Sequence, residues 1–455
     1  MHLGVLRLGC VTGPCSHPEK AMTDLIAARS QMAVSLGFHI VFAAIGIAMP
    51  LMMTIAEWRW LKTGDQTYFI LAKRWAKGTA ILFAVGAVSG TVLSFELGLL
   101  WPSFMNWAGP LIGPLFALEG FAFFTEAIFL GLYLYGWKQL RPRVHLAAGM
   151  VVALSGVASA IFVVIANAWM NAPTGFELSQ GQPIHLDPIA AMRNPHAAGE
   201  TVHMVLAAFA TTGFAVAGIH AYLLLRDRAN EFHRRALEIA LIVGGIPAIL
   251  QPLSGDLLTK DVAHHQPAKL AAIEALFHTE DGAAFRIGGL PNAERQDVRY
   301  ALEIPYGLSL LLYFDPHARV AGLDTVPKRD WPPVAVVHLA FQFMVMVGFI
   351  MMGLALWAGW RWWRGHALER ETALLRTLVL ASPLGFLAIE SGWVVTEVGR
   401  QPWIIYGVMR TSEAVTPMPG LWVPMITFTL LYCVLAAVVV WLLKRHIAAA
   451  ADSTI

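Results

Sequence analysis

The chain alternates between long apolar runs and short polar connections, and this alternation predicts membrane-spanning helices. The hydrocarbon core of a bilayer is about 30 Å thick, so a helix needs about 20 consecutive apolar residues to cross it. Nine runs reach this length, near residues 32–57, 78–100, 110–136, 146–170, 198–225, 236–254, 333–360, 374–398 and 421–443. A long polar interval, residues 255–332, separates the sixth run from the seventh. We therefore expect an all-α integral membrane protein with one nine-helix domain over residues 22–445.

Basic residues gather at alternate ends of these runs. Lys and Arg crowd the connections after the first, third, fifth, seventh and ninth runs, whereas the short connections after the even-numbered runs carry only Arg193, Arg400 and Arg410. Cytoplasmic loops are enriched in Lys and Arg. This distribution predicts an N-terminus outside, a cytoplasmic C-terminal tail over residues 446–455, and an outer position for the interval 255–332.

The composition agrees with a membrane protein and argues against other classes. Of the 455 residues, 57% are hydrophobic and 14% are charged, whereas soluble domains carry about 25% charged residues. The net charge of +2 gives no sign of nucleic-acid binding, and the spacing of the three cysteines builds no metal or disulfide framework. Residues 1–21 fit neither a secretory signal peptide nor a span, so we expect a disordered or mis-started extension that ends before Met22.

Ionisable residues inside the apolar runs are the candidates for chemistry. They are His39, Glu96, Glu119, Glu126, His203, Glu390 and Glu397. Taken alone, a membrane histidine is more often a packing residue than a ligand, and an acid near a helix end often reaches the headgroups. In the predicted topology, however, His39, Glu96, His203 and Glu397 all fall in the outer half of the membrane. Imidazole and carboxylate groups that converge at one depth suit a metal ion or haem iron.

Two acids of the third run suggest a proton path. Glu119 and Glu126 are seven residues apart, so they share one face of their helix and are separated by about 10.5 Å along it, at about 1.5 Å per residue. Acids that run inward from the level of a metal site are typical of a proton relay.

Five segments, taken in order, resemble subunit I of the cytochrome bd-type ubiquinol oxidases. They are FHIVF in the first run, LEGFAFFTEAIFLGLYLYGW in the third, NPHAAGETVH before the fifth, KLAAIEA in the polar interval and ESGWVVTEVGRQPW at the end of the eighth. The resemblance extends from about Met22 to Arg445. The short polar interval is similar to the quinol loop of the variety that includes cyanide-insensitive oxidases. The resemblance implies a haem-binding helix bundle in the bacterial cytoplasmic membrane.

The resemblance also implies the activity of a terminal quinol oxidase. Ubiquinol or menaquinol would be oxidised at the outer face. Its electrons would pass through a low-spin haem b to a high-spin haem b and a haem d, or a b-type haem in place of haem d. Dioxygen would become water with protons from the cytoplasm, which generates a proton gradient. The implied partners are oxidase subunit II, a small accessory membrane subunit and membrane lipid, with the second, third and ninth runs as candidate contact surfaces.

Family roles then fall on matching positions of this sequence. His203 and Met344 would be the axial ligands of the low-spin haem iron. His39 and Glu397 would each serve the iron of one high-spin haem, with Glu119 close to the oxygen-reducing iron.

Further positions receive supporting roles from the same resemblance. Lys269 and Glu274, from KLAAIEA, would belong to the quinol site. Glu126 would hand on protons or balance haem charge. Arg400 would meet a haem propionate or another acid, and Trp393 would stack near a porphyrin or fill the core.

Several of these assignments have simpler alternatives. Lys269 and Glu274 also fit a solvated helix face, and Arg400 also fits plain interfacial anchoring. Met344 and Met346 lie about 200° apart around a helix, so only one can face an iron, and both also fit gap-filling in the core.

Two questions stay open at the level of the sequence. Gln342 stands where the family pattern often has arginine, which leaves the potential of the low-spin haem open. The second question is whether the chain belongs to another functional class. A proton-coupled transporter would also bury carboxylates. Such transporters commonly show inverted repeats or broken helices near the membrane midplane, and the sequence gives no sign of either. A purely structural membrane subunit would tolerate the loss of His39, His203 and Glu397.

Overall fold

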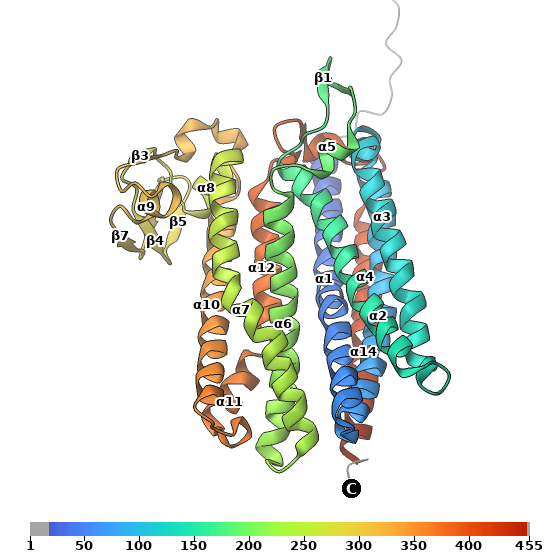
Figure 1. Cartoon of the computed structure of the whole chain (residues 1–455). Helices are drawn as coiled ribbons and strands as arrows, with labels where there is room; N and C mark the ends of the chain where they lie inside the picture. Colours follow the sequence, from blue (N-terminus) through green and yellow to red (C-terminus); the bar gives the residue numbers. More distant parts are fainter. Residues whose placement is uncertain (1–17, 453–455) are drawn as a thin grey trace, which may run out of the picture.

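Nine helical spans lie side by side in the computed structural model, which describes residues 18–452 of the chain and the side chains of residues 22–445 (Figure 1). The spans are α1 (Pro18–Thr63), α2 (Gln66–Leu100), α3 (Pro102–Tyr135), α4 (Pro142–Asn171), α6 (Ala197–Arg226), α7 (Glu231–His265), α10 (Val334–Trp363), α11 with α12 (Thr372–Ala381 and Leu384–Gly399) and α14 (Trp422–Asp452). The predicted all-α fold with nine spans is thereby confirmed for the described residues, and the orientation of the termini stays a prediction. The predicted extension over residues 1–21 lies outside the described residues, except that α1 begins at Pro18.

The helices extend beyond the apolar runs that predict them. Helix α7 continues to His265, so the predicted outer interval 255–332 begins inside a helix rather than in a loop. Helix α14 likewise continues through most of the predicted C-terminal tail. Polar residues that lie outside the hydrocarbon core can still form the backbone hydrogen bonds of the helix, so the helix continues past its apolar part. A hydropathy window therefore reports the apolar part of a helix and not its ends.

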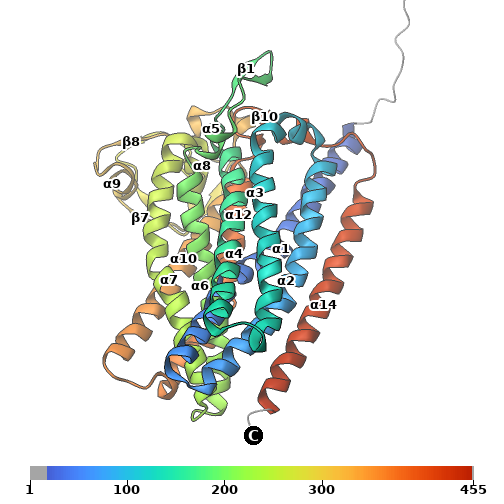
Figure 2. The same cartoon turned by 45° about the vertical axis from the view of Figure 1, so that its right-hand side comes forward.

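The spans pack as pairs around a central group. Helix α1 packs against α2, α3 against α4, and α6 against α7 (Figures 1 and 2). Helices α1 and α6 form the centre: they contact each other, and each of them also contacts α4 and α12. The crossing of α6 and α7 is close because Gly213 and Gly244 meet there. A Cβ atom on Gly213 would lie 2.4 Å from the Cα atom of Gly244, so neither position has room for a side chain.

The eighth span is broken, although the sequence predicts one continuous helix over residues 374–398. Helix α11 ends at Ala381 and α12 begins at Leu384. Pro383 has no backbone N–H to donate, and its ring clashes with the carbonyl of an intact helix. The break lies against α6, where a Cβ atom on Gly218 would lie 2.4 Å from the Cβ atom of Ser382.

The connections predicted to lie outside gather at the end of the bundle opposite the C-terminus, which we call the outer end (Figure 1). Their short helices are α5 (Pro188–Met192), α8 (Pro267–Ile273), α9 (Gly307–Tyr313) and α13 (Thr411–Ala414). Their antiparallel strand pairs are β1 (Glu177–Ser179) with β2 (Gln182–Ile184), β3 (Glu280–Asp281) with β8 (Arg319–Val320), β4 (Phe285–Ile287) with β7 (Leu302–Ile304), β5 (Leu290–Asn292) with β6 (Asp297–Arg299), and β9 (Trp403–Ile405) with β10 (Met409–Arg410). An apolar core that includes Leu270, Leu308 and Leu323 joins the interval between α7 and α10 to Val337 of α10.

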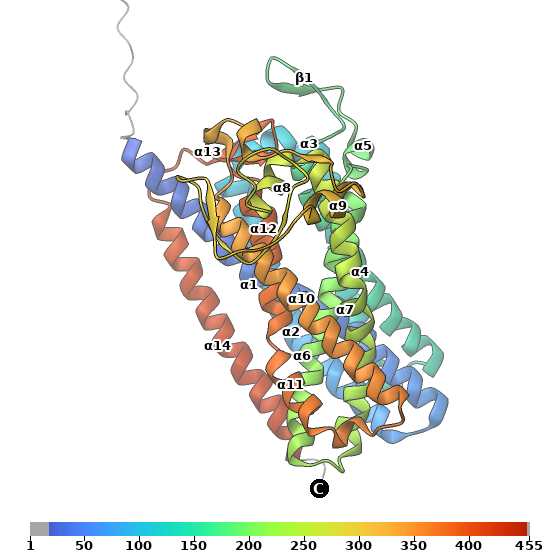
Figure 3. The same ribbon diagram turned by 90° about the vertical axis from the view of Figure 1, so that its left-hand side faces the viewer.

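Three spans have the smallest buried share of residues. In their most apolar windows only 11% of the residues of α14, 17% of those of α2 and 22% of those of α3 are buried, the three lowest shares among the described spans. Helix α14 stands at one edge of the bundle, against α1 and α2 (Figure 3). Phe95 of α2 and Phe121 of α3 are 66% and 75% exposed. These faces require lipid or another apolar surface to cover them.

Candidate functional site

The carboxylate of Glu397, in the last turn of α12, is bound from two sides. Asn167 Nδ2 of α4 donates to Oε1 at 2.5 Å, and Arg400 Nη2 donates to Oε2 at 2.6 Å. Arg400 is 2% exposed, and its Nε and Nη1 atoms have no hydrogen-bond partner within the described part of the chain. The buried guanidinium of Arg400 therefore has two N–H donor groups free to bind an anionic group of another molecule. A carboxylate that accepts two hydrogen bonds from one arginine is bound strongly. Plain interfacial anchoring does not account for this burial.

A hydrogen-bonded network leads from Glu397 to the buried Lys269 of α8. Asn167 is one turn before Asn171 on α4, and Asn171 donates to its Oδ1 at 3.2 Å. Lys269 Nζ donates to Asn171 Oδ1 at 2.6 Å, and Asn171 Nδ2 donates to Glu200 Oε1 of α6 at 3.3 Å. A predicted haem residue and a predicted quinol residue therefore share one network. The two asparagines and Glu200 were not singled out from the sequence, although the i, i+4 spacing of the asparagines within an apolar run places them on one helix face.

Lys269 and Glu274 are not on a solvated helix face. They are 3% and 2% exposed. Burial lowers the pKa of the Lys269 ammonium to about 7; Glu200 and Glu397 oppose this shift, and Arg400 adds to it. A lysine of this kind can hold or release a proton near neutral pH.

Glu274 lies in a different environment from Lys269. Glu274 directly follows the last residue of α8 and continues its right-handed backbone, so it lies about 140° around the helix axis from Lys269, at about 100° per residue. Burial raises the pKa of the Glu274 carboxyl to about 8, against the opposing effect of Arg286. Neither carboxyl oxygen has a hydrogen-bond partner among the described residues. A buried carboxyl group without a partner can form a hydrogen bond with a hydroxyl group of another molecule or accept a proton from it.

We expect the raised pKa of Glu274 to make stability depend on pH. Because its native pKa of about 8 exceeds the ordinary value of 4.5 for a glutamate, the folded protein holds the proton more tightly than the unfolded chain does. The stabilisation is complete below pH 4.5 and is lost as pH rises toward 8. Glu274→Gln should remove this dependence, which is on the order of a few kcal/mol. Thermal unfolding at pH 6 and pH 9 measures it.

Glu294→Gln is the matched control, because Glu294 is an exposed acid of the same interval. It should follow the wild-type pH profile. Parallel pH profiles for wild type and Glu274→Gln would contradict the expected role of this carboxyl.

Three predicted haem-ligand side chains each face a glycine on a neighbouring helix. A Cβ atom on Gly90 of α2 would lie 2.9 Å from His39 Cε1, and one on Gly255 of α7 would lie 3.4 Å from His203 Cε1. A Cβ atom on Gly392 of α12 would lie 3.0 Å from the sulfur of Met344. Because each of these neighbouring residues is a glycine, no side chain from that position occupies the space beside the candidate ligand.

The two imidazoles are oriented by serine hydroxyl groups. His39 Nδ1 lies 3.0 Å from Ser89 Oγ, and His203 Nδ1 lies 2.9 Å from Ser254 Oγ. A hydrogen bond to one ring nitrogen leaves the other available as a ligand. The amide nitrogen of Gln251 lies 3.1 Å from His203 Nε2, so iron at that nitrogen requires Gln251 to turn away.

The structure separates the two methionines of α10. Met344 is partly buried against Gly392, whereas Met346 is 51% exposed. Met344 therefore has the inward orientation that a ligand needs.

Three other candidates lie on α3 and α12. Glu126 is 5% exposed, and its Oε1 atom has no hydrogen-bond partner within residues 22–445. Its oxygens face Gly156 of α4, whereas Glu119 is only partly buried. Trp393 packs against an apolar cluster that includes Ile40 of α1, and its buried indole N–H has no partner in the part of the chain that the structure describes.

Gln342 holds the outer interval to α10. Its Oε1 atom accepts from the N–H of Gly288 and its Nε2 atom donates to the carbonyl of Arg286, both at 3.0 Å. One turn earlier, His338 Nδ1 and Nε2 lie 2.7 Å from the carbonyl oxygen of Ile273 and 3.1 Å from that of Gly288. The residue that departs from the family pattern thus binds backbone groups of the outer interval.

Comparisons with known proteins match nearly the whole chain. Residues 27–451 match the protein family described as Cytochrome bd terminal oxidase subunit I. A solved structure, the bd oxidase from Geobacillus thermodenitrificans, superposes with a TM-score of 0.88 and 38% sequence identity, over 94% of this chain and 99% of that chain.

Two relatives from Bacillus subtilis (strain 168) are similar in sequence. One, provisionally named cytochrome bd menaquinol oxidase subunit I, is 38% identical over 93% of this chain and 97% of its own length. The other, named cytochrome bd ubiquinol oxidase subunit 1, is 32% identical over 95% of both chains.

Proposed function

Because this chain belongs to the cytochrome bd terminal oxidase subunit I family, it is a subunit of a quinol:oxygen oxidoreductase, and we propose that it oxidises quinol at the outer end of the bundle and holds the haems at which dioxygen becomes water. The observation that carries this proposal is the network from Arg400 through Glu397, Asn167 and Asn171 to Lys269. It brings the candidate haem pocket and the candidate quinol site within one set of hydrogen bonds.

The residues present fit haem groups. His203 and Met344 would hold the iron of the low-spin haem, and His39 and Glu397 would each hold that of one high-spin haem. The spare donors of Arg400 suit a propionate, and glycines stand beside three of the ligand side chains. When bound, haems supply the redox centres that carry electrons from quinol to dioxygen.

The outer acids and bases would receive the quinol protons. Oxidation of a quinol to a quinone releases two protons with two electrons. Lys269 and Glu274 have pKa values of about 7 and about 8, so each can accept or pass on a proton near neutral pH. Both residues lie at the outer end of the bundle, so these protons would leave on the outer side.

The acids of α3 would bring protons for water from the other side. Glu126 lies closer to the cytoplasmic end of α3, and its Oε1 atom is buried without a partner in the described chain. It would hold a proton and pass it toward Glu119, about 10.5 Å nearer the outer end at about 1.5 Å per residue. Protons consumed inside and released outside generate a gradient across the bacterial cytoplasmic membrane.

A partner subunit would cover part of the exposed apolar surface. The faces of α2, α3 and α14 are the least buried of the described spans, and we assign them to oxidase subunit II, an accessory membrane subunit or lipid.

The test is a reduced-minus-oxidised absorption spectrum of the purified membrane protein, recorded together with oxygen consumption on quinol. We expect absorption bands from a low-spin and two high-spin haems and quinol-dependent oxygen uptake; extraction of the pigment identifies haem b and haem d. A colourless protein that moves protons with a solute would sink the proposal in favour of a transporter.

A further inference from the structure

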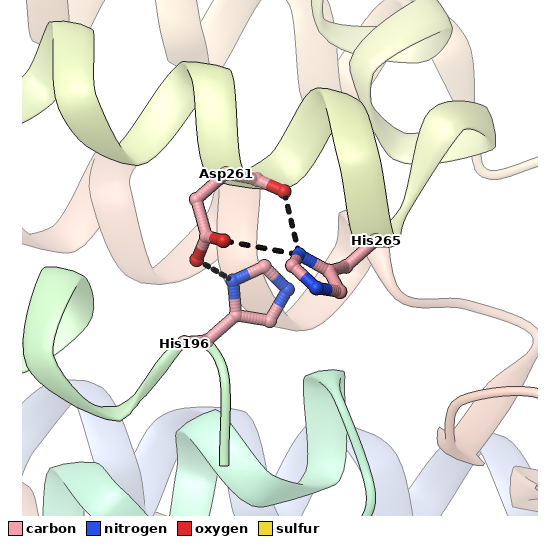
Figure 4. Close-up of side chains that lie close together, drawn as sticks. All are labelled: His196, Asp261 and His265. Carbon is pink, nitrogen blue, oxygen red and sulfur yellow. Dashed lines mark hydrogen bonds and ion pairs between the residues drawn. The ribbon is translucent and has the colours of Figure 1, made fainter.

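Two histidines and an aspartate that have no role assigned above meet at the outer end, next to the Lys269 network. His196 precedes α6, and Asp261 and His265 lie one turn apart near the end of α7 (Figure 4). His196 Nδ1 lies 2.5 Å from Asp261 Oδ2, and His265 Nδ1 lies 3.0 Å from Asp261 Oδ1. One ligand atom from each residue lies within 4.8 Å of the others.

The arrangement leaves binding capacity unused. His196 is fully buried, and its Nε2 atom has no hydrogen-bond partner among the residues the structure describes. A buried polar atom without a partner is costly. The side chains of Asp261 and His265 are 25% and 40% exposed, so an ion can reach the group from the outer surface.

The ligand types select a class of ion. Imidazole nitrogen with one carboxylate oxygen suits Zn²⁺ and similar borderline transition metals, whereas Ca²⁺ and Mg²⁺ prefer oxygen ligands alone. Zinc holds such atoms at about 2.0–2.2 Å in a tetrahedral arrangement, so two ligand atoms lie about 3.4 Å apart. The three ligand atoms, which lie within 4.8 Å of one another, therefore have to approach one another by up to about 1.4 Å, and rotation of the partly exposed side chains of Asp261 and His265 can supply this movement.

We propose that His196, Asp261 and His265 form a Zn²⁺ site at the outer end, with water completing the coordination, and that zinc bound there slows quinol oxidation. The second part rests on the proposed function. The ion would join the start of α6 to the end of α7. Gln266, next to His265, donates to Asn171 Oδ1 at 3.3 Å, the same oxygen that accepts from Lys269. The N–H of Glu200 donates to the carbonyl of His196 at 3.0 Å. Zinc thus restrains both sides of the Lys269 network.

Binding of zinc alone is measured first, by equilibrium dialysis of ⁶⁵Zn²⁺ against the purified holoenzyme carrying no polyhistidine tag. We expect one site in the wild type and a loss of affinity of about 100-fold in His265→Ala and in Asp261→Asn. His264→Ala is the matched control, because His264 is the exposed neighbour of His265 and lies outside the cluster; it should bind zinc like the wild type. Equal zinc binding in wild type and His265→Ala, or none in the wild type, would overturn the site.

Inhibition is measured separately. Zinc should lower quinol-dependent oxygen uptake in wild type and His264→Ala and much less in His265→Ala, and a chelator should restore the rate. Binding without any inhibition would overturn the regulatory part of the proposal. A protein without quinol oxidase activity would instead refute the proposed function, and the dialysis result would still decide the zinc site.

Discussion

Replacing Met344 with leucine should abolish quinol oxidation and remove the low-spin haem signal. The thioether sulfur lies against Gly392 of α12, and leucine retains the apolar volume while it removes the only atom able to bind iron. Methionine opposite histidine raises the potential of a haem, which suits an acceptor of electrons from quinol. We expect oxygen uptake on quinol to fall below about 1% of wild type, on the order of 3 kcal/mol or more in barrier height.

Met346→Leu is the matched control for this variant. Its side chain is 51% exposed on the outward face of the same helix, so the spectrum and the rate should stay close to wild type. The reverse pattern in the two spectra would assign the ligand to Met346. An unchanged low-spin signal in both variants would exclude both methionines.

Lys269→Met should lower quinol oxidation strongly and leave the haem spectrum intact. The ammonium is buried and donates to Asn171, and Glu200 and Glu397 lie in the same charged group. Methionine has a similar length, but it supplies neither the charge nor the donor, so the proton acceptor is lost and buried acids lose a compensating cation. We expect a fall of about 100-fold in the rate on quinol, since general acid–base groups contribute about 10²–10⁴-fold.

Two comparisons make this prediction specific. An artificial electron donor that bypasses the quinol site should still drive oxygen uptake in Lys269→Met. Lys328→Met removes an exposed lysine from the same outer interval and should behave like the wild type. Equal losses with both electron donors would mean that Lys269 serves the haem pocket rather than the quinol site.

The architecture could be predicted from the sequence because a bilayer imposes a length and a polarity on every span. The ends of the helices could not, because residues such as those of α7 up to His265 continue the helix in polar surroundings. The break in the eighth span follows from Pro383, but prolines also lie inside intact helices here, as Pro247 and Pro252 do in α7. Whether a proline breaks a helix therefore depends on its tertiary neighbours.

The candidate site was predictable where one residue type in an apolar run is unusual. Glu397 stands out in this way, as a carboxylate inside an apolar run, whereas Lys269 lies in the polar interval and was assigned only from the family resemblance. The contacts of Asn171 and the pairing of His196 with Asp261 could not be predicted from the sequence, since they join residues from different helices. The latter pair is separated by 65 positions, and only the packing of α6 on α7 brings it together.

The attachment of the outer interval to α10 has a thermodynamic consequence. Gln342 binds the backbone of Arg286 and Gly288 two residues before the proposed ligand Met344. A displacement of this backbone when quinol binds acts on the helix that carries the ligand. If quinol binding shifts the potential of that haem, linkage requires that reduction of the haem changes quinol affinity by the same factor. Each ten-fold change in affinity corresponds to about 59 mV for one electron. In an oxidase with this coupling, the redox state of the low-spin haem would control whether the quinone is released and how tightly the next quinol is bound.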